Sequence, residues 1–112
     1  MIDKLKENEV FVFGSNLDGL HIGGAAKLAH EKFGAQMGIG AGFQGKSYAI
    51  PTMNGWNTLL RYSNQFIDFA SHYPELTFLL TPIGTGIAGY SYKEIEPVFS
   101  ALPPNVKKVG WE

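Results

Sequence analysis

A glycine-rich turn from Thr81 to Tyr90 is the part of this sequence best suited to binding chemistry. It reads TPIGTGIAGY and lies between an apolar run, residues 76–81, and a segment with the spacing of a capped helix start. Glycine has no Cβ, so successive N–H groups can converge on an anion, and the following helix adds the partial positive charge of its N-terminus. In open α/β sheets, ligands bind at such strand ends. The pattern therefore predicts that this turn contacts a phosphate; the alternative is a tight turn that binds no ligand. The predicted contact residues are Gly84, Thr85, Gly86, Ile87, Ala88, Gly89 and Tyr90.

Two formal nucleotide motifs do not fit their surroundings. Gly84, Gly86 and Gly89 satisfy G-x-G-x-x-G, but a Rossmann site carries that pattern in its first strand–helix unit, and here it follows a later strand. Residues 40–47, GAGFQGKS, satisfy the P-loop pattern, which needs a strand before it and a helix after it. A loop precedes these residues and a strand stopped by Pro51 follows them, so we interpret the match as accidental.

A second glycine-rich region follows the first apolar run. Gly14, Ser15 and Asn16 come directly after it, and HIGGAA stands at the start of the first expected helix. The Ser and Asn side chains could bond ribose hydroxyls, and the backbone of Gly23, Gly24 and Ala25 could approach a diphosphate. The alternative is that Ser15 and Asn16 only form a turn. Since parallel strands bring their carboxyl ends to one edge of a sheet, we expect both glycine regions to lie together.

Few side chains could do acid–base or metal chemistry. His21 is the one acid–base candidate near a glycine loop, and a plain loop residue is the favoured interpretation. His21, His30 and His72 lack the spacing of metal ligands, so we expect no metal, and nothing indicates a cofactor. Tyr90 and Trp56 could stack on a base, although single aromatics more often pack in a core.

The elements that must position these residues alternate between strand and helix. Strands are expected at 10–13, 47–50, 76–81 and 106–111, and helices at 24–33, 59–73 and 91–102, the last containing Pro97; residues 35–46 are expected to form a loop. The first strand is apolar throughout, which is typical of a strand buried on both faces. The pattern predicts one α/β domain over residues 1–112, with three layers, α/β/α, around a mostly parallel, mixed sheet.

Composition narrows the classes of partner. Hydrophobic residues make up 45% of the chain and charged residues 17%, which is typical of a folded domain. The net charge of -1 offers no basic field for a nucleic acid polymer. The sequence has no cysteine, and its first residues form neither a signal peptide nor a membrane-length run. We therefore expect a cytoplasmic protein with no membrane or nucleic acid partner.

Four segments, taken in order, resemble the macro domain, the ADP-ribose-binding module, in a short form seen in phages and bacteria. They cover about two thirds of the chain: VFVFGSN, HIGGAAKLAHEKFG, SYAIPT and TPIGTGIAGYSYKE. The resemblance implies a minimal macro-like fold, with Asn16 on the distal ribose, residues 23–25 along the diphosphate, and residues 85–90 around the phosphates and the distal ribose. Only Asp3 precedes the first strand, so the family's adenine-selecting Asp is not matched.

The resemblance and the residues leave three functions open. The first is binding of ADP-ribose or a related phosphate-bearing nucleotide through the glycine loops. The second is hydrolysis of an ADP-ribosyl bond or a nucleotide signal, although Ala26 or Lys27 and Ala88 stand where hydrolytic members of the family carry Asp. The third is a non-catalytic protein that binds or inhibits a partner protein.

Overall fold

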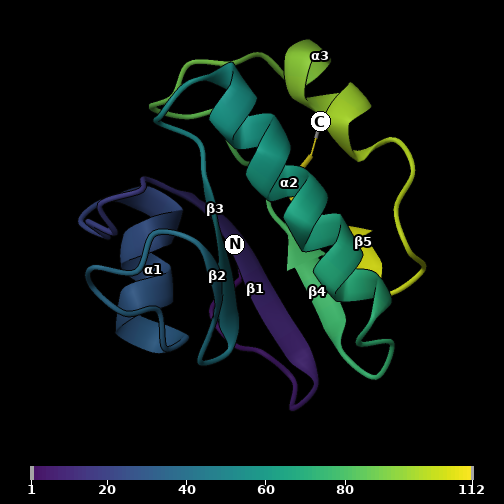
Figure 1. The fold of residues 1–112 in the computed structure, drawn as a ribbon. Coiled ribbons are helices and arrows are strands. Elements are labelled where there is room, and N and C mark those ends of the chain that lie inside the picture. The colour runs from purple at the N-terminus through teal and green to yellow at the C-terminus, as the bar shows by residue number, and fades with distance from the viewer. Residues whose placement is uncertain (1, 112) are drawn as a thin grey trace.

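The structure is a computed structural model that describes residues 2–111. A five-stranded sheet forms its centre. Its strand order is β2-β3-β1-β4-β5; β2 runs antiparallel to β3, and the other neighbours are parallel. Two helices, α1 and α2, lie on opposite sides of the sheet (Figure 1). The predicted α/β/α class with a mostly parallel, mixed sheet is therefore confirmed. The elements are β1 (Glu9–Ser15), α1 (Gly24–Lys32), β2 (Gly42–Gln44), β3 (Ser47–Pro51), α2 (Trp56–Ser71), β4 (Thr77–Leu80), α3 (Tyr92–Ile95), a 3-10 turn η1 (Glu96–Phe99) and β5 (Val106–Lys108).

The central strand β1 is buried on both faces because its side chains alternate between two apolar clusters. Val10 and Val12 pack with α2, whereas Phe11 and Phe13 pack with α1. Successive side chains of a strand point to opposite faces of the sheet, so a run that is apolar at every position needs a helix on each side. The sequence pattern of residues 10–13 thus determines the three layers.

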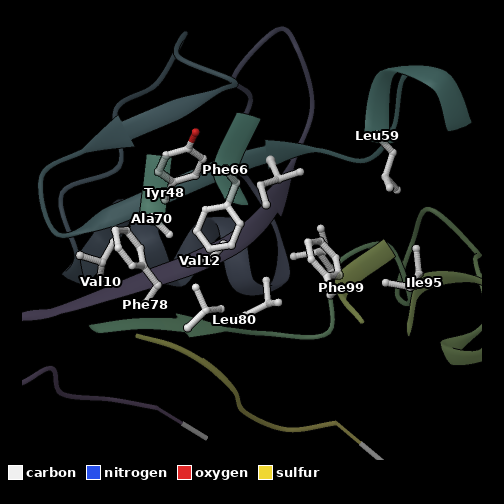
Figure 2. Packing of buried hydrophobic residues seen from close by; sticks show 13 residues of the cluster. Val10, Val12, Tyr48, Leu59, Phe66, Ala70, Phe78, Leu80, Ile95 and Phe99 are labelled. Carbon is white, nitrogen blue, oxygen red and sulfur yellow. The ribbon is translucent and has the colours of Figure 1, made fainter. Parts of the chain in front are cut away.

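The larger cluster lies between the sheet and α2 (Figure 2). Leu59, Phe66 and Ala70 follow one stripe of α2 and are fully buried. The Phe66 ring meets Phe78 and Tyr48 at centroid distances of 5.5 and 5.0 Å. Burying each large apolar side chain contributes roughly 1.5–3 kcal/mol. Burial also raises the pKa of Tyr48 from 10.0 to about 12, because the phenolate would lose its hydration there.

Several element boundaries differ from the sequence prediction. The strand expected at 10–13 continues to Ser15, and the helix expected at 59–73 spans 56–71. Residues 42–44, expected in a loop, form the edge strand β2, since Phe43 and Gln44 pair with β3. The expected helix 91–102 begins with the predicted capping box, in which Glu94 N donates to Ser91 Oγ, but it changes to the 3-10 turn η1 at Glu96, directly before Pro97. Proline has no N–H to continue the α-helical bonding. The last strand ends at Lys108 instead of residue 111.

Helix α2 is the longest helix, at 16 residues, and its outer face is polar. Within residues 2–111, no helix has both the length and the apolar composition needed to cross a membrane.

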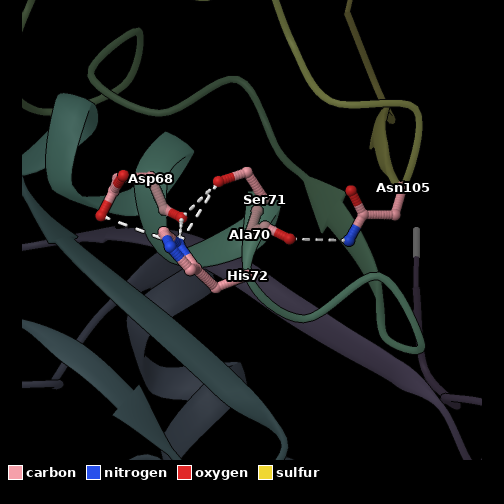
Figure 3. Close-up of polar contacts among 5 residues, drawn as sticks. All are labelled: Asp68, Ala70, Ser71, His72 and Asn105. Carbon is pink, nitrogen blue, oxygen red and sulfur yellow. Dashed lines mark hydrogen bonds and ion pairs between the residues drawn. The ribbon is translucent and has the colours of Figure 1, made fainter.

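Asn105 ties the end of α2 to the start of β5. Its Nδ2 donates to the carbonyl oxygens of Ala70, Tyr73 and Leu76, each at 3.0 Å. Figure 3 shows the contact with Ala70 beside the helix end, where the exposed Asp68 and His72 also interact. Two of these oxygens, those of Ala70 and Tyr73, also accept the backbone N–H groups of Tyr73 and Leu76. The Asn105 amide is therefore a second donor that holds the turn after α2 against the start of β5.

We expect Asn105→Asp to lower the free energy of unfolding by about 2–3 kcal/mol, because a carboxylate would replace the donor and face several carbonyl oxygens at a helix C-terminus. Urea unfolding measures this change. Ser71→Ala removes another bond at the same helix end, on an exposed side chain, and serves as the control, with a loss of at most about 0.5 kcal/mol. Equal losses in the two variants would mean that Asn105 contributes nothing specific.

Candidate functional site

A cleft of about 600 Å³ opens where three parallel strands end and α1 begins. Both glycine-rich regions line it. The two regions approach closely at their centre, since a Cβ added to Gly14 would lie 3.6 Å from Gly84 N. The lining residues are Gly14, Ser15, Asn16, Leu20, Ile22, Gly23, Gly24, Ala25, Ala26, Thr52, Met53, Thr81, Pro82, Ile83, Gly84, Thr85, Gly86, Ile87 and Ala88.

The N-terminus of α1 contributes free backbone donors to this cleft. Gly23 is the N-cap residue and supplies no side chain to cap the helix, and the first turn contains no acidic residue. The first amide bonded into the helix is that of Lys27, which donates to Gly23 O at 3.2 Å. Within the described part of the chain, the amides of Gly24, Ala25 and Ala26 therefore have no acceptor. These N–H groups carry the partial positive charge of the helix end.

The turn after β4 contributes a second set of free donors. Four of its amides are bonded within the turn. Ile83 N donates to Thr81 O at 2.7 Å and Thr85 N to Pro82 O at 3.4 Å, while Gly89 N and Tyr90 N donate to Gly86 O and Gly84 O, each at 2.9 Å. Among residues 2–111, no acceptor is bonded to the amides of Gly84, Gly86, Ile87 and Ala88. All four residues line the cleft, whereas Gly89 and Tyr90, which were also predicted as ligand contacts, complete the turn outside it.

The polar side chains of the cleft already form bonds within the protein. Asn16 Oδ1 accepts from Leu20 N at 3.0 Å, and its Nδ2 donates to Leu20 O at 3.2 Å. The hydroxyl groups of the cleft also donate to backbone carbonyl oxygens of the protein. These bonds run from Ser15 to Gly40 O, Thr52 to Ser15 O, Thr81 to Val12 O and Thr85 to Pro82 O. Asn16 thus forms the turn that the alternative interpretation expects, whereas Ser15 is the last residue of β1 and bonds to a distant loop. A ribose contact by either side chain stays a prediction. Their side chains hold the two loops in position.

No ionisable side chain lines the cleft in the described part of the chain. His21, the acid–base candidate, is 1% exposed and lies outside the lining, with its ring packed edge-on against Phe13. Its Nε2 lies 3.0 Å from Ile39 O, and because a carbonyl oxygen only accepts, this nitrogen carries the hydrogen. The geometry gives His21 a packing role and does not support a catalytic one.

The remaining sequence features also have structural roles. Trp56 and Tyr90 contact each other, with ring centroids 5.2 Å apart, at the edge of the α2 cluster. Lys46 of the formal P-loop match donates to Lys6 O at 2.8 Å and is followed by β3 instead of a helix. Over residues 2–111, no three His, Asp or Glu side chains come close enough to share a metal ion.

Sequence reasoning missed several apolar residues of the cleft, notably Leu20, Ile22 and Met53. Met53 follows the end of β3, so the rule that parallel strands end at one edge could have identified it. Leu20 and Ile22 had no such signal, because an apolar residue in a loop does not reveal whether the fold exposes it.

Comparison of the chain with protein-family models, curated proteins and solved structures found no match.

Proposed function

We propose that this protein binds ADP-ribose or a related phosphate-bearing nucleotide, with the phosphates on backbone amides in the cleft. One observation carries the proposal: two sets of residues with unpaired amides, 24–26 and 84 with 86–88, line the same cleft. Convergent N–H groups and an uncapped helix N-terminus are the means by which proteins bind phosphate without a cationic side chain.

The size and chemistry of the cleft favour a nucleotide over a simple anion. A volume of about 600 Å³ lies within the range of roughly 300–1,000 Å³ found for small-molecule sites. The amides come from two separate loops, so one phosphate on each loop, as in a diphosphate, would satisfy both sets. Apolar side chains beside the amides offer a surface for the rest of the ligand.

Binding is favoured over hydrolysis because the cleft provides no general acid or base of its own. Such catalysis needs a titratable side chain within hydrogen-bond reach of the reacting group, and none lines the cleft among the described residues. The macro-domain resemblance stays a hypothesis, to which the free amides add support. No feature of the cleft specifically favours the third possibility, an inhibitor or interaction protein.

Titration calorimetry with ADP-ribose tests the proposal, and adenosine, which lacks phosphate, is the control. We expect saturable binding of ADP-ribose and none of adenosine at the same concentration. Ligand at about 100 times its dissociation constant should add roughly 2.7 kcal/mol to the free energy of unfolding, which raises Tm by roughly 10 °C or more. Equal heats from ADP-ribose and adenosine, or no binding of either at millimolar concentration, would contradict phosphate recognition.

A further inference from the structure

Two of the most exposed apolar side chains of the described chain lie on the two loops that carry the free amides. Ile22 is 74% exposed and stands just before α1, and Ile87 is 87% exposed in the turn after β4. Both line the cleft, together with the half-exposed Leu20 and Met53. Single exposed apolar residues are common on protein surfaces. Four of them around one cleft, next to unpaired donors, indicate a ligand with a charged part and an apolar part.

The polar side chains near these apolar residues are poorly placed to distinguish one base from another. Proteins distinguish bases by hydrogen bonds from side chains or backbone to the base edges, and a site built on such bonds discriminates strongly. The amide and hydroxyl side chains of the cleft already donate to backbone carbonyl groups of the protein. An apolar surface discriminates weakly, because every base offers it a similar face.

We infer that the cleft binds nucleoside diphosphates without selecting the base, holding the diphosphate on the amides and the base against Ile22 and Ile87. This inference rests on the proposed function and adds its substrate class. Purines and pyrimidines should bind with similar affinity, and purines slightly more tightly because they cover more apolar surface.

Calorimetric titrations of ADP, GDP, CDP, UDP and inorganic pyrophosphate into the full chain test the inference. We expect the four nucleotides to have dissociation constants within about fivefold of one another, because apolar contacts alone separate them. In the double variant Ile22→Ser and Ile87→Ser, all four should bind about tenfold more weakly through lost apolar contact, while pyrophosphate, which touches only amides, should bind as before. Leu17→Ser is the matched control, since Leu17 is exposed but lies outside the cleft lining.

The outcomes separate this inference from the proposed function. Bases of one size cover similar apolar surface, so a preference of more than about twentyfold between ADP and GDP, or between CDP and UDP, requires hydrogen bonds to the base. Such a preference would overturn the inference while leaving nucleotide binding intact. Unchanged nucleotide affinities in the double isoleucine variant would overturn the placement of the base. Absence of binding by pyrophosphate and by every nucleotide, ADP-ribose included, would instead reject the proposed function itself.

Discussion

Replacing Gly23 with aspartate is expected to abolish ADP-ribose binding while leaving the fold at least as stable as before. Gly23 is the N-cap of α1, with φ -154° and ψ 157°, an extended conformation that any residue adopts, and a Cβ there would meet no heavy atom within 4 Å. An aspartate at this position accepts the free amides of the first turn and adds a charge that suits the helix dipole. Its carboxylate would then occupy the place of the phosphate.

The expected loss of affinity is large because the two groups would repel each other. Unit charges about 4 Å apart near a protein surface interact by about 4 kcal/mol, so we expect ADP-ribose to bind at least about 100-fold more weakly. Calorimetry measures the affinity, and thermal unfolding should show Tm unchanged or a few degrees higher, since the cap adds a few tenths of a kcal/mol or more.

Two further substitutions at the same position separate charge from occupancy. Gly23→Ala leaves the amides open and should retain binding within about threefold, as its methyl group meets no neighbour. Gly23→Asn caps the helix without charge and should weaken binding less than aspartate does. Undiminished ADP-ribose binding by the aspartate variant would show that the phosphates do not lie at α1.

Gly40→Ala is expected to destabilise the protein far more than Gly23→Ala or Gly86→Ala, whose Cβ atoms meet nothing within 4 Å. A Cβ at Gly40 would overlap the carbonyl oxygen of Asn16 and lie 2.8 Å from Leu17 Cα. These are backbone atoms, so the loop that begins at Asn16 would have to move away from residue 40. The buried bond from Ser15 Oγ to Gly40 O would be disturbed as well.

We expect the free energy of unfolding to fall by about 3 kcal/mol, the upper part of the range for overpacking, which corresponds to a Tm lowered by roughly 10–20 °C. Gly86→Ala is the matched control: its Cβ meets nothing within 4 Å, so stability should stay within about 0.5 kcal/mol. Thermal and urea unfolding of the two variants measure the difference. A loss of less than about 1 kcal/mol for Gly40→Ala would mean that the two loops separate at little cost.

Local patterns were sufficient to predict most of the helices and strands. The continuous apolar run of residues 10–13 requires cover on both faces and so predicts the layers. The stripe from Leu59 to Ala70 predicts the buried face of α2. The capping box of Ser91 and Glu94 marks the start of α3. Each of these signals depends on residues close together in the chain.

The features that the sequence did not predict are those that form only through contacts with residues far away in the chain. β2 is a three-residue strand because it finds the edge of β3, and nothing in its own glycine-rich sequence predicts that pairing. Asn105 gave no signal either, since its three acceptors are 29 to 35 residues away in the chain.

For the candidate site, the sequence by itself determined that glycine-rich backbone at two strand ends could be free to donate. It placed the helix N-terminus after the second turn, but Ser91 caps that helix, α3, outside the cleft lining, and the free N-terminus in the cleft is that of α1. Only the tertiary structure decided which side chains remained free. In the folded protein, Asn16 is bonded to Leu20 and His21 is buried against Phe13. Ile22 and Ile87, in contrast, stay exposed beside the amides. The physical reason is that an amide at a helix start lacks a partner by local geometry, whereas a side chain's partners depend on where the whole chain folds.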